Sequence, residues 1–204
     1  MTALLVALLL VLLLPLFVGK WQVSLLGLAA QGLLMGWLAC RWPHGAGEVS
    51  WLTIVDLLLV RGVVLPVVLW RVLRARAATG RDGLPPNLLT WAGAVLLLLA
   101  AFRAAEVLAP TPALLHLQVA VAISGLLLGF LVLATQGGVF AQVVGVVRIA
   151  NAVALLQLGS GHADWVFALA HLVLVGGTLV ALRHVLIVVR EVPAATSAGR
   201  ESPV

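Results

Sequence analysis

Three charged side chains interrupt apolar stretches that are long enough to cross a bilayer: Asp56, Arg61 and Arg148. A charged side chain at the centre of a membrane helix costs about 2.5–3.5 kcal/mol on insertion scales. Such a residue is retained where it faces protein or water, pairs with another group, or serves an ion pathway. We therefore expect these three residues to mark the functional part of the chain.

The spacing of Asp56 and Arg61 decides whether their side chains can pair with each other on one helix. Residues five apart are separated by about 140° around an α-helix, so the two side chains should not share a face. Each is then expected to pair with another span or another subunit. Arg148 also needs an acceptor, and Asp56 is the one carboxylate placed equally deep in the sequence. Our hypothesis is an interhelical Asp56–Arg148 pair.

Weaker candidates surround these charges. Gln31 could line a wet interior or hold helices together, and the sequence favours neither. Arg103 and Glu106 stand three residues apart near a span end, where a partly solvated ion pair is favoured over a transport role. His171 is a candidate proton carrier because histidine titrates near neutral pH, although simple packing is the commoner role for such a residue.

No catalytic or metal centre is predicted within this chain. Cys40 is the single cysteine, which excludes a disulfide and a thiolate-bound cluster within the chain. A membrane-embedded haem would need paired axial ligands, and nothing ties His116 to His171. Nucleotide-binding and nucleophile-elbow motifs are also missing. We expect no cofactor in this chain and no redox activity of the chain alone.

Composition places the chain in a membrane. Hydrophobic residues make up 63% of it and charged residues 9%, and the mean hydropathy is +1.21. A span needs about 20 apolar residues. The sequence predicts an all-α integral membrane bundle of seven transmembrane helices, a single domain over residues 1–192, and a short disordered tail over 193–204. The expected spans are Thr2–Val18, Gln22–Cys40, Val49–Trp70, Asn87–Leu108, Ala113–Ala134, Val139–Leu158 and Asp164–Val189.

Charge in the loops predicts the orientation. With seven spans, one side of the membrane carries Lys20, Arg71, Arg74, Arg76, Arg81, Arg183, Arg190 and Arg200, whereas Arg41 is the one basic residue in the opposite loops. The positive-inside rule then puts the N-terminus outside and the C-terminus in the cytoplasm. Eleven arginines against one lysine are typical of a GC-rich bacterium, so a bacterial inner membrane is the expected location.

Two functions fit these features. The chain could be a subunit of a proton-pumping membrane arm, in which buried polar groups line a half-channel or hold neighbouring subunits. It could instead be a small stand-alone transporter. Transporters often carry inverted repeats and broken helices, and this sequence has no convincing repeat, with Pro66 as its strongest interruption.

Several short strings carry a family resemblance. They are Ala30-Gln31-Gly32-Leu33 with Ser24 before it, Arg61 followed by Val64-Leu65-Pro66, Gln142-x-x-Gly145 leading to Asn151, and the basic pair Arg183-His184. Together with the seven-span layout, they resemble hydrogenase-4 component E. This is a membrane subunit of complex-I-like group 4 hydrogenase assemblies, and it is related to the small K subunit of respiratory complex I.

The resemblance implies partners and cofactors. It implies antiporter-like membrane subunits and a peripheral redox module, with nickel–iron and iron–sulfur centres on that module and not on this chain. The same membrane arm could serve another redox reaction or a proton-coupled inorganic-carbon uptake system.

The chain departs from the family at two acidic positions. Where the family has a membrane glutamate before an Asn-Gly, this chain has Ala150 before Asn151-Ala152, and an acidic residue of the last span is absent near His171. A buried carboxylate can relay protons because burial raises its pKa, whereas arginine stays protonated. The relay role therefore does not transfer to Ala150. The chain is expected to be a scaffold, or to carry a path rebuilt around Asp56, Arg61, Arg148 and His171.

Overall fold

The described part of the protein is helical throughout. The structure is a computed structural model that describes residues 1–17, 21–41, 49–74, 88–110, 112–135 and 139–160, together with 169, 170, 173, 176, 177 and 180. Its elements are α1 (Thr2–Phe17), α2 (Trp21–Cys40), α3 (Trp51–Val55), η1 (Asp56–Val64), α4 (Leu65–Arg74), α5 (Leu88–Leu108), α6 (Ala113–Thr135) and α7 (Val139–Ser160). The predicted all-α class is confirmed for these residues.

Five helical stretches in the described residues are long and apolar enough to cross a membrane. They are Gln22–Cys40, Trp51–Arg71, Thr90–Leu108, Ala113–Thr135 and Ala141–Leu158, and they coincide with the second to sixth predicted spans. The first predicted span forms a shorter apolar helix over Thr2–Leu14. The chain is therefore a multi-pass membrane protein by the length and composition of its helices.

The remaining sequence predictions fall largely outside the described residues. The chain divides into two compact units, Met1–Ala168 and Leu169–Val204. Most of the predicted last span over Asp164–Val189, and all of the tail over 193–204, lie outside the described residues.

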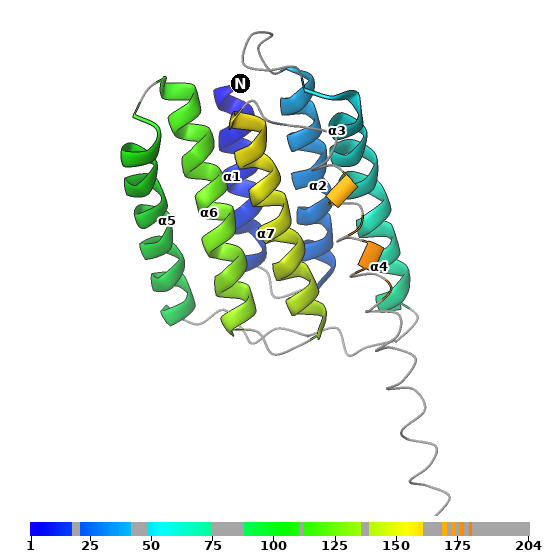
Figure 1. The fold of residues 1–204 in the computed structure, drawn as a ribbon. Coiled ribbons are helices and arrows are strands. Elements are labelled where there is room, and N and C mark those ends of the chain that lie inside the picture. The colour runs from blue at the N-terminus through cyan, green and yellow to red at the C-terminus, as the bar shows by residue number, and fades with distance from the viewer. Residues whose placement is uncertain are drawn as a thin grey trace, which may run out of the picture. The chain divides into compact units, whose positions relative to one another are not determined.

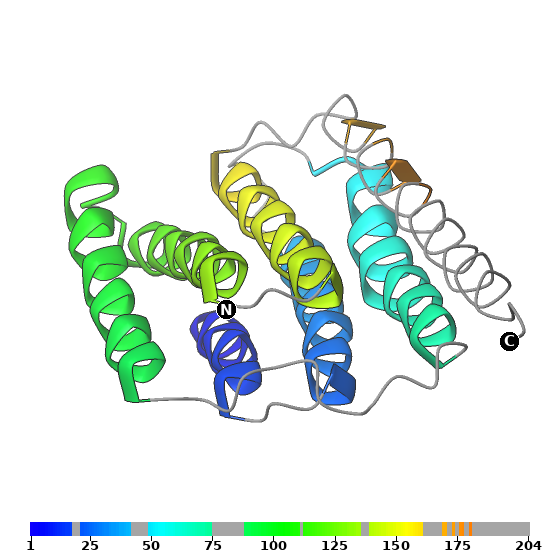
Figure 2. The same ribbon diagram turned by 90° about the horizontal axis from the view of Figure 1, so that it is seen from below.

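In the first unit, the helices stand roughly side by side (Figure 1). Viewed along the bundle, α5 lies at one edge against α6, α1 and α7 follow, and the η1–α4 rod lies at the other edge beside α2 (Figure 2). The apolar core runs through this arrangement, from Leu8 of α1 and Met35 of α2 to Val121 of α6 and Leu155 of α7. Helix α7 thus has neighbours on several sides and is well placed to receive polar contacts.

One rod is built from three consecutive segments, a π-helix with an α-helix on each side. α3, η1 and α4 follow one another without a break from Trp51 to Arg74, and the middle segment is a nine-residue π-helix. At its end, the Leu65 N–H bonds the carbonyl of Val60, five residues earlier. Pro66 comes next, where it has no N–H to donate and its ring crowds the carbonyl four residues back. A wider turn relieves that crowding, so Pro66 is a local reason for the π geometry.

Close contact between backbones holds this rod against α2. A Cβ added at Gly32 would lie 2.5 Å from the Gly62 backbone nitrogen, so only glycine allows the two helices to approach this closely. One turn later, a Cβ added at Gly36 would overlap the side chain of Leu58. Small residues spaced four apart let membrane helices pack through van der Waals contact, because lipid supplies no hydrophobic drive for association.

Candidate functional site

The π-helical turn brings Asp56 and Arg61 together. Residues five apart are nearly one turn apart in a π-helix, where each N–H bonds the carbonyl five residues back. The Arg61 Nε donates to Asp56 Oδ2 at 2.9 Å. The prediction that these side chains do not share a face is therefore wrong, because it assumed a regular α-helix with 100° per residue.

The ion pair is buried at the centre of the rod. Asp56 is 4% exposed and Arg61 is 2% exposed. Arg61 is the middle residue of the apolar stretch Trp51–Arg71, ten residues from either end. A buried pair loses the hydration of both charges, and the loss is offset only when further hydrogen bonds satisfy the remaining polar atoms.

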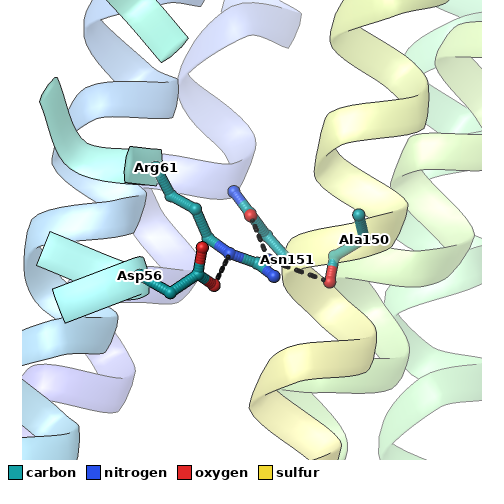
Figure 3. Close-up of polar contacts among 4 residues, drawn as sticks. All are labelled: Asp56, Arg61, Ala150 and Asn151. Atoms are coloured by element: carbon teal, nitrogen blue, oxygen red, sulfur yellow. Dashed lines mark hydrogen bonds and ion pairs between the residues drawn. The ribbon is translucent and has the colours of Figure 1, made fainter. Parts of the chain in front are cut away.

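Arg61 extends the pair across the bundle to α7. Its Nη1 donates to the side-chain Oδ1 of Asn151 at 2.8 Å and to the backbone carbonyl of Ala150 at 3.2 Å. Figure 3 shows the guanidinium lying between the carboxylate and α7. At the position where the family resemblance expects a glutamate, Ala150 thus supplies a backbone oxygen. We name Asp56, Arg61, Ala150 and Asn151 the Arg61 cluster.

The Arg61 cluster keeps unused hydrogen-bonding capacity. Within the described residues, Asp56 Oδ1, Arg61 Nη2 and Asn151 Nδ2 are buried and have no partner. One is an acceptor and two are donors. Buried polar atoms are nearly always satisfied by protein or ordered water, so these three atoms are the ones to which a water molecule or another polar group can bind.

Arg148 does not pair with Asp56. It is 1% exposed, and its Nη1 donates to the backbone carbonyl of Leu12 on α1 at 3.4 Å. Its Nε has no partner in the part of the chain that the structure describes. The hypothesis of an Asp56–Arg148 pair is therefore wrong: the π-turn gives Asp56 a partner on its own rod, and Arg148 points to a different helix.

Gln118 is a buried polar residue that the sequence analysis missed. It is fully buried on α6, and its Nε2 donates to the Leu155 carbonyl of α7 at 2.7 Å. The feature of the sequence that identifies it is an amide side chain within the long apolar stretch Ala113–Thr135. Helix α7 thus makes polar side-chain contacts with three neighbours: η1 through Arg61, α6 through Gln118, and α1 through Arg148.

Gln31, Arg103 and Glu106 are not members of the Arg61 cluster, and one predicted site residue lies outside the described residues. Gln31 is 2% exposed and precedes the Gly32 contact with the rod. Arg103 and Glu106 form the predicted pair, at 2.9 Å, with side chains 81% and 53% exposed. His171 is outside the described residues.

A metal site is not apparent in the described residues. Among them, no group of three or more histidine, cysteine, aspartate or glutamate side chains could hold a metal ion. The chemistry that the Arg61 cluster can perform is binding and orientation of polar groups at membrane depth.

Comparison with known proteins leaves the family open. No model of a protein family, no curated protein and no solved structure matches the chain. The resemblance to hydrogenase-4 component E stays a prediction from the sequence.

Proposed function

We propose that this protein is a non-catalytic membrane subunit of a multisubunit, complex-I-like assembly that couples a redox reaction to proton or cation movement. In this role it is a scaffold, and the Arg61 cluster borders part of the ion path. The observation that carries the proposal is the cluster itself: a charged pair at mid-membrane depth that joins two helices and keeps buried polar atoms open.

Charge balance supports a role among partners. The buried charged residues of the described part are Asp56, Arg61 and Arg148, which is two positive charges and one negative. An uncompensated charge in the membrane interior is costly. A complementary group from another segment or subunit would offset the excess charge.

The composition of the Arg61 cluster limits how it could handle protons. Arginine stays protonated in proteins and cannot relay a proton by losing one. Asp56 is the cluster's one carboxylate, and its open Oδ1 can bind water. A proton path here therefore runs through water and Asp56, with His171 as a further candidate carrier, and not through the position of Ala150.

The proposal includes a seven-span topology in a bacterial inner membrane, with the N-terminus outside and the C-terminus in the cytoplasm. It also includes the partners that the resemblance implies. These are antiporter-like membrane subunits and a peripheral module whose nickel–iron and iron–sulfur centres carry the redox chemistry.

Purification from the native host in mild detergent tests the proposal directly. We expect the tagged chain to bring antiporter-like subunits and a metal-bearing peripheral module, which mass spectrometry and metal analysis would identify. A lone monomer or homodimer that transports a solute after reconstitution would instead establish a stand-alone transporter. Recovery with carbon-uptake components would assign the membrane arm to that system.

Replacement of Arg61 tests whether the Arg61 cluster takes part in coupling. We expect Arg61→Met to impair ion movement by the assembled complex, because it leaves Asp56 buried without its charged partner and removes the contact with Asn151. Arg61→Lys keeps the charge and should be the milder change. Full pumping by a correctly assembled Arg61→Met complex would remove the residue from the mechanism.

A further inference from the structure

A groove opens on the outside of the bundle between α2 and α4. Its volume is about 440 Å³. Apolar side chains form nearly all of its wall, and the residues that line most of its length are Leu25, Leu26, Ala29, Pro66, Val67 and Trp70.

The groove follows from how the two helices meet. Their close contact is at Gly32 and Gly62, where backbone lies against backbone. Toward the start of α2 and the end of α4, side chains larger than glycine lie between the two helices. Leu25 is 3% exposed and fills the space between the helices, whereas Leu26 and Val67 are 69% and 43% exposed and stand at the sides. The result is a concave apolar surface open to the membrane.

The groove has one polar end. Gln22 begins the apolar stretch Gln22–Cys40, Arg71 ends the stretch Trp51–Arg71, and both residues line the groove. Both stretches thus end at the same level, so the boundary between membrane and water falls there. Pro66, at the other end, lies five residues before Arg71, which is about 7.5 Å deeper. The groove therefore runs from the interface into the hydrocarbon layer.

We propose that this groove is a binding site for an anionic phospholipid, with one acyl chain along the apolar wall and the phosphate at Arg71. The polar end and apolar length match the orientation of a lipid. Arg71 and Arg74, the exposed basic residues in the last turn of α4, favour a negative headgroup, and basic pockets between membrane helices bind such headgroups. Trp70 lies at the level where tryptophan commonly anchors membrane proteins.

A lipid fits this surface better than a partner helix does. Membrane helices pack through small residues that let backbones approach, whereas Leu26, Val67 and Trp70 at the edges of the groove are large. These side chains border an apolar groove beside exposed arginines, which suits a flexible acyl chain with a charged head.

Native mass spectrometry of the full chain in detergent tests the site. Phosphatidylglycerol and phosphatidylcholine with identical acyl chains are the probes. We expect phosphatidylglycerol to bind the wild-type protein more tightly, and Arg71→Gln to weaken its binding about fivefold, as expected for the loss of one basic contact with an anionic lipid. Arg41→Gln, directly after the far end of α2, is the matched control and should leave binding unchanged.

A second pair of variants tests the groove itself. Val67→Trp, which adds bulk at the edge of the groove, should reduce retention of both lipids, whereas Leu96→Trp on the exposed face of α5 should not. Equal binding of the two lipids by wild-type protein, or unchanged binding in both Arg71→Gln and Val67→Trp, would overturn the proposal. A protein segment cross-linked to residue 67 in native membranes in place of lipid would also overturn it.

Discussion

The Arg61 side chain is shared between two helices. Its Nε binds the carboxylate of Asp56 on its own rod, and its Nη1 binds Asn151 and a carbonyl of α7. The guanidinium group makes this possible because its donors are arranged in a rigid fork. Lysine has a single nitrogen, so Arg61→Lys cannot reproduce the separate contacts from Nε and Nη1.

The buried pair predicts strong coupling between two substitutions. Asp56→Asn alone leaves a buried arginine without its carboxylate, and we expect it to lower the free energy of unfolding by about 3–5 kcal/mol. Arg61→Met alone should cost a similar amount. The double variant should cost much less than the sum, because it leaves no unpaired charge. Equilibrium unfolding in mixed micelles measures the free energy of unfolding of the wild type, the two single variants and the double variant, which together form a double-mutant cycle.

Two controls accompany that cycle. Glu106→Gln breaks the exposed pair with Arg103 and should change the free energy of unfolding by about 0–1 kcal/mol. Asp56→Asn and Arg148→Gln should have additive effects, since these residues do not contact each other. Coupling between Asp56 and Arg148, together with additivity between Asp56 and Arg61, would contradict the observed pairing.

At the scale of elements, the π-helical segment η1 determines the site. A regular α-helix over the same residues would turn Asp56 and Arg61 apart by about 140°. In the π-helix they meet, and the rod keeps its backbone contact with α2 at Gly62. Short π-helical segments are uncommon and are found frequently at functional sites.

The contact between α2 and η1 predicts a large penalty for a very small substitution. A methyl group at Gly32 would lie 2.5 Å from the Gly62 nitrogen and 2.7 Å from the Arg61 carbonyl carbon. Because backbone must move to accept it, we expect Gly32→Ala to lower the free energy of unfolding by at least 1–3 kcal/mol. Unfolding of the detergent-solubilised protein measures the loss.

Gly93 provides the matched control for that substitution. An added Cβ at Gly93 meets only Leu131 Cδ1, at 3.8 Å, which is ordinary van der Waals contact. Gly93→Ala should therefore be neutral or stabilise the helix by up to about 1 kcal/mol. Equal changes in the free energy of unfolding for the two variants would show that the α2–η1 contact accepts a methyl group at Gly32.

At the scale of the whole molecule, charge asymmetry predicts the topology in the membrane. Cys40 is exposed at the end of α2, and Arg74 is exposed at the end of α4. If the basic residues face the cytoplasm, these two positions lie on opposite sides. We expect a membrane-impermeant thiol reagent to label Cys40 in spheroplasts, and not to label a Cys40→Ser, Arg74→Cys variant until the membrane is opened.

The reverse labelling pattern would contradict the predicted orientation. Labelling of both positions in sealed spheroplasts would contradict the placement of the two helix ends on opposite sides. The same assay identifies the leaflet that contains the proposed lipid site, because Arg71 and Arg74 both lie in the last turn of α4.

The sequence by itself determined the class of the protein and the location of most spans. Apolar stretches of about 20 residues have one stable form in a bilayer, a helix that satisfies its own backbone hydrogen bonds, so Gln22–Cys40 could be predicted with its bounds. The cost of burying charge likewise singled out Asp56, Arg61 and Arg148, and the structure buries all three.

Only the tertiary structure decided which of these groups meet. The Asp56–Arg61 pair depends on a local change of helical pitch beside Pro66 and Gly62, and regular α-helical spacing predicts the opposite. The contacts of Arg61 with Asn151 and of Gln118 with Leu155 link residues 90 and 37 positions apart. Such contacts depend on how the helices pack, and in a chain this uniformly apolar the packing is directed by a few glycines and amides whose partners a single sequence does not reveal.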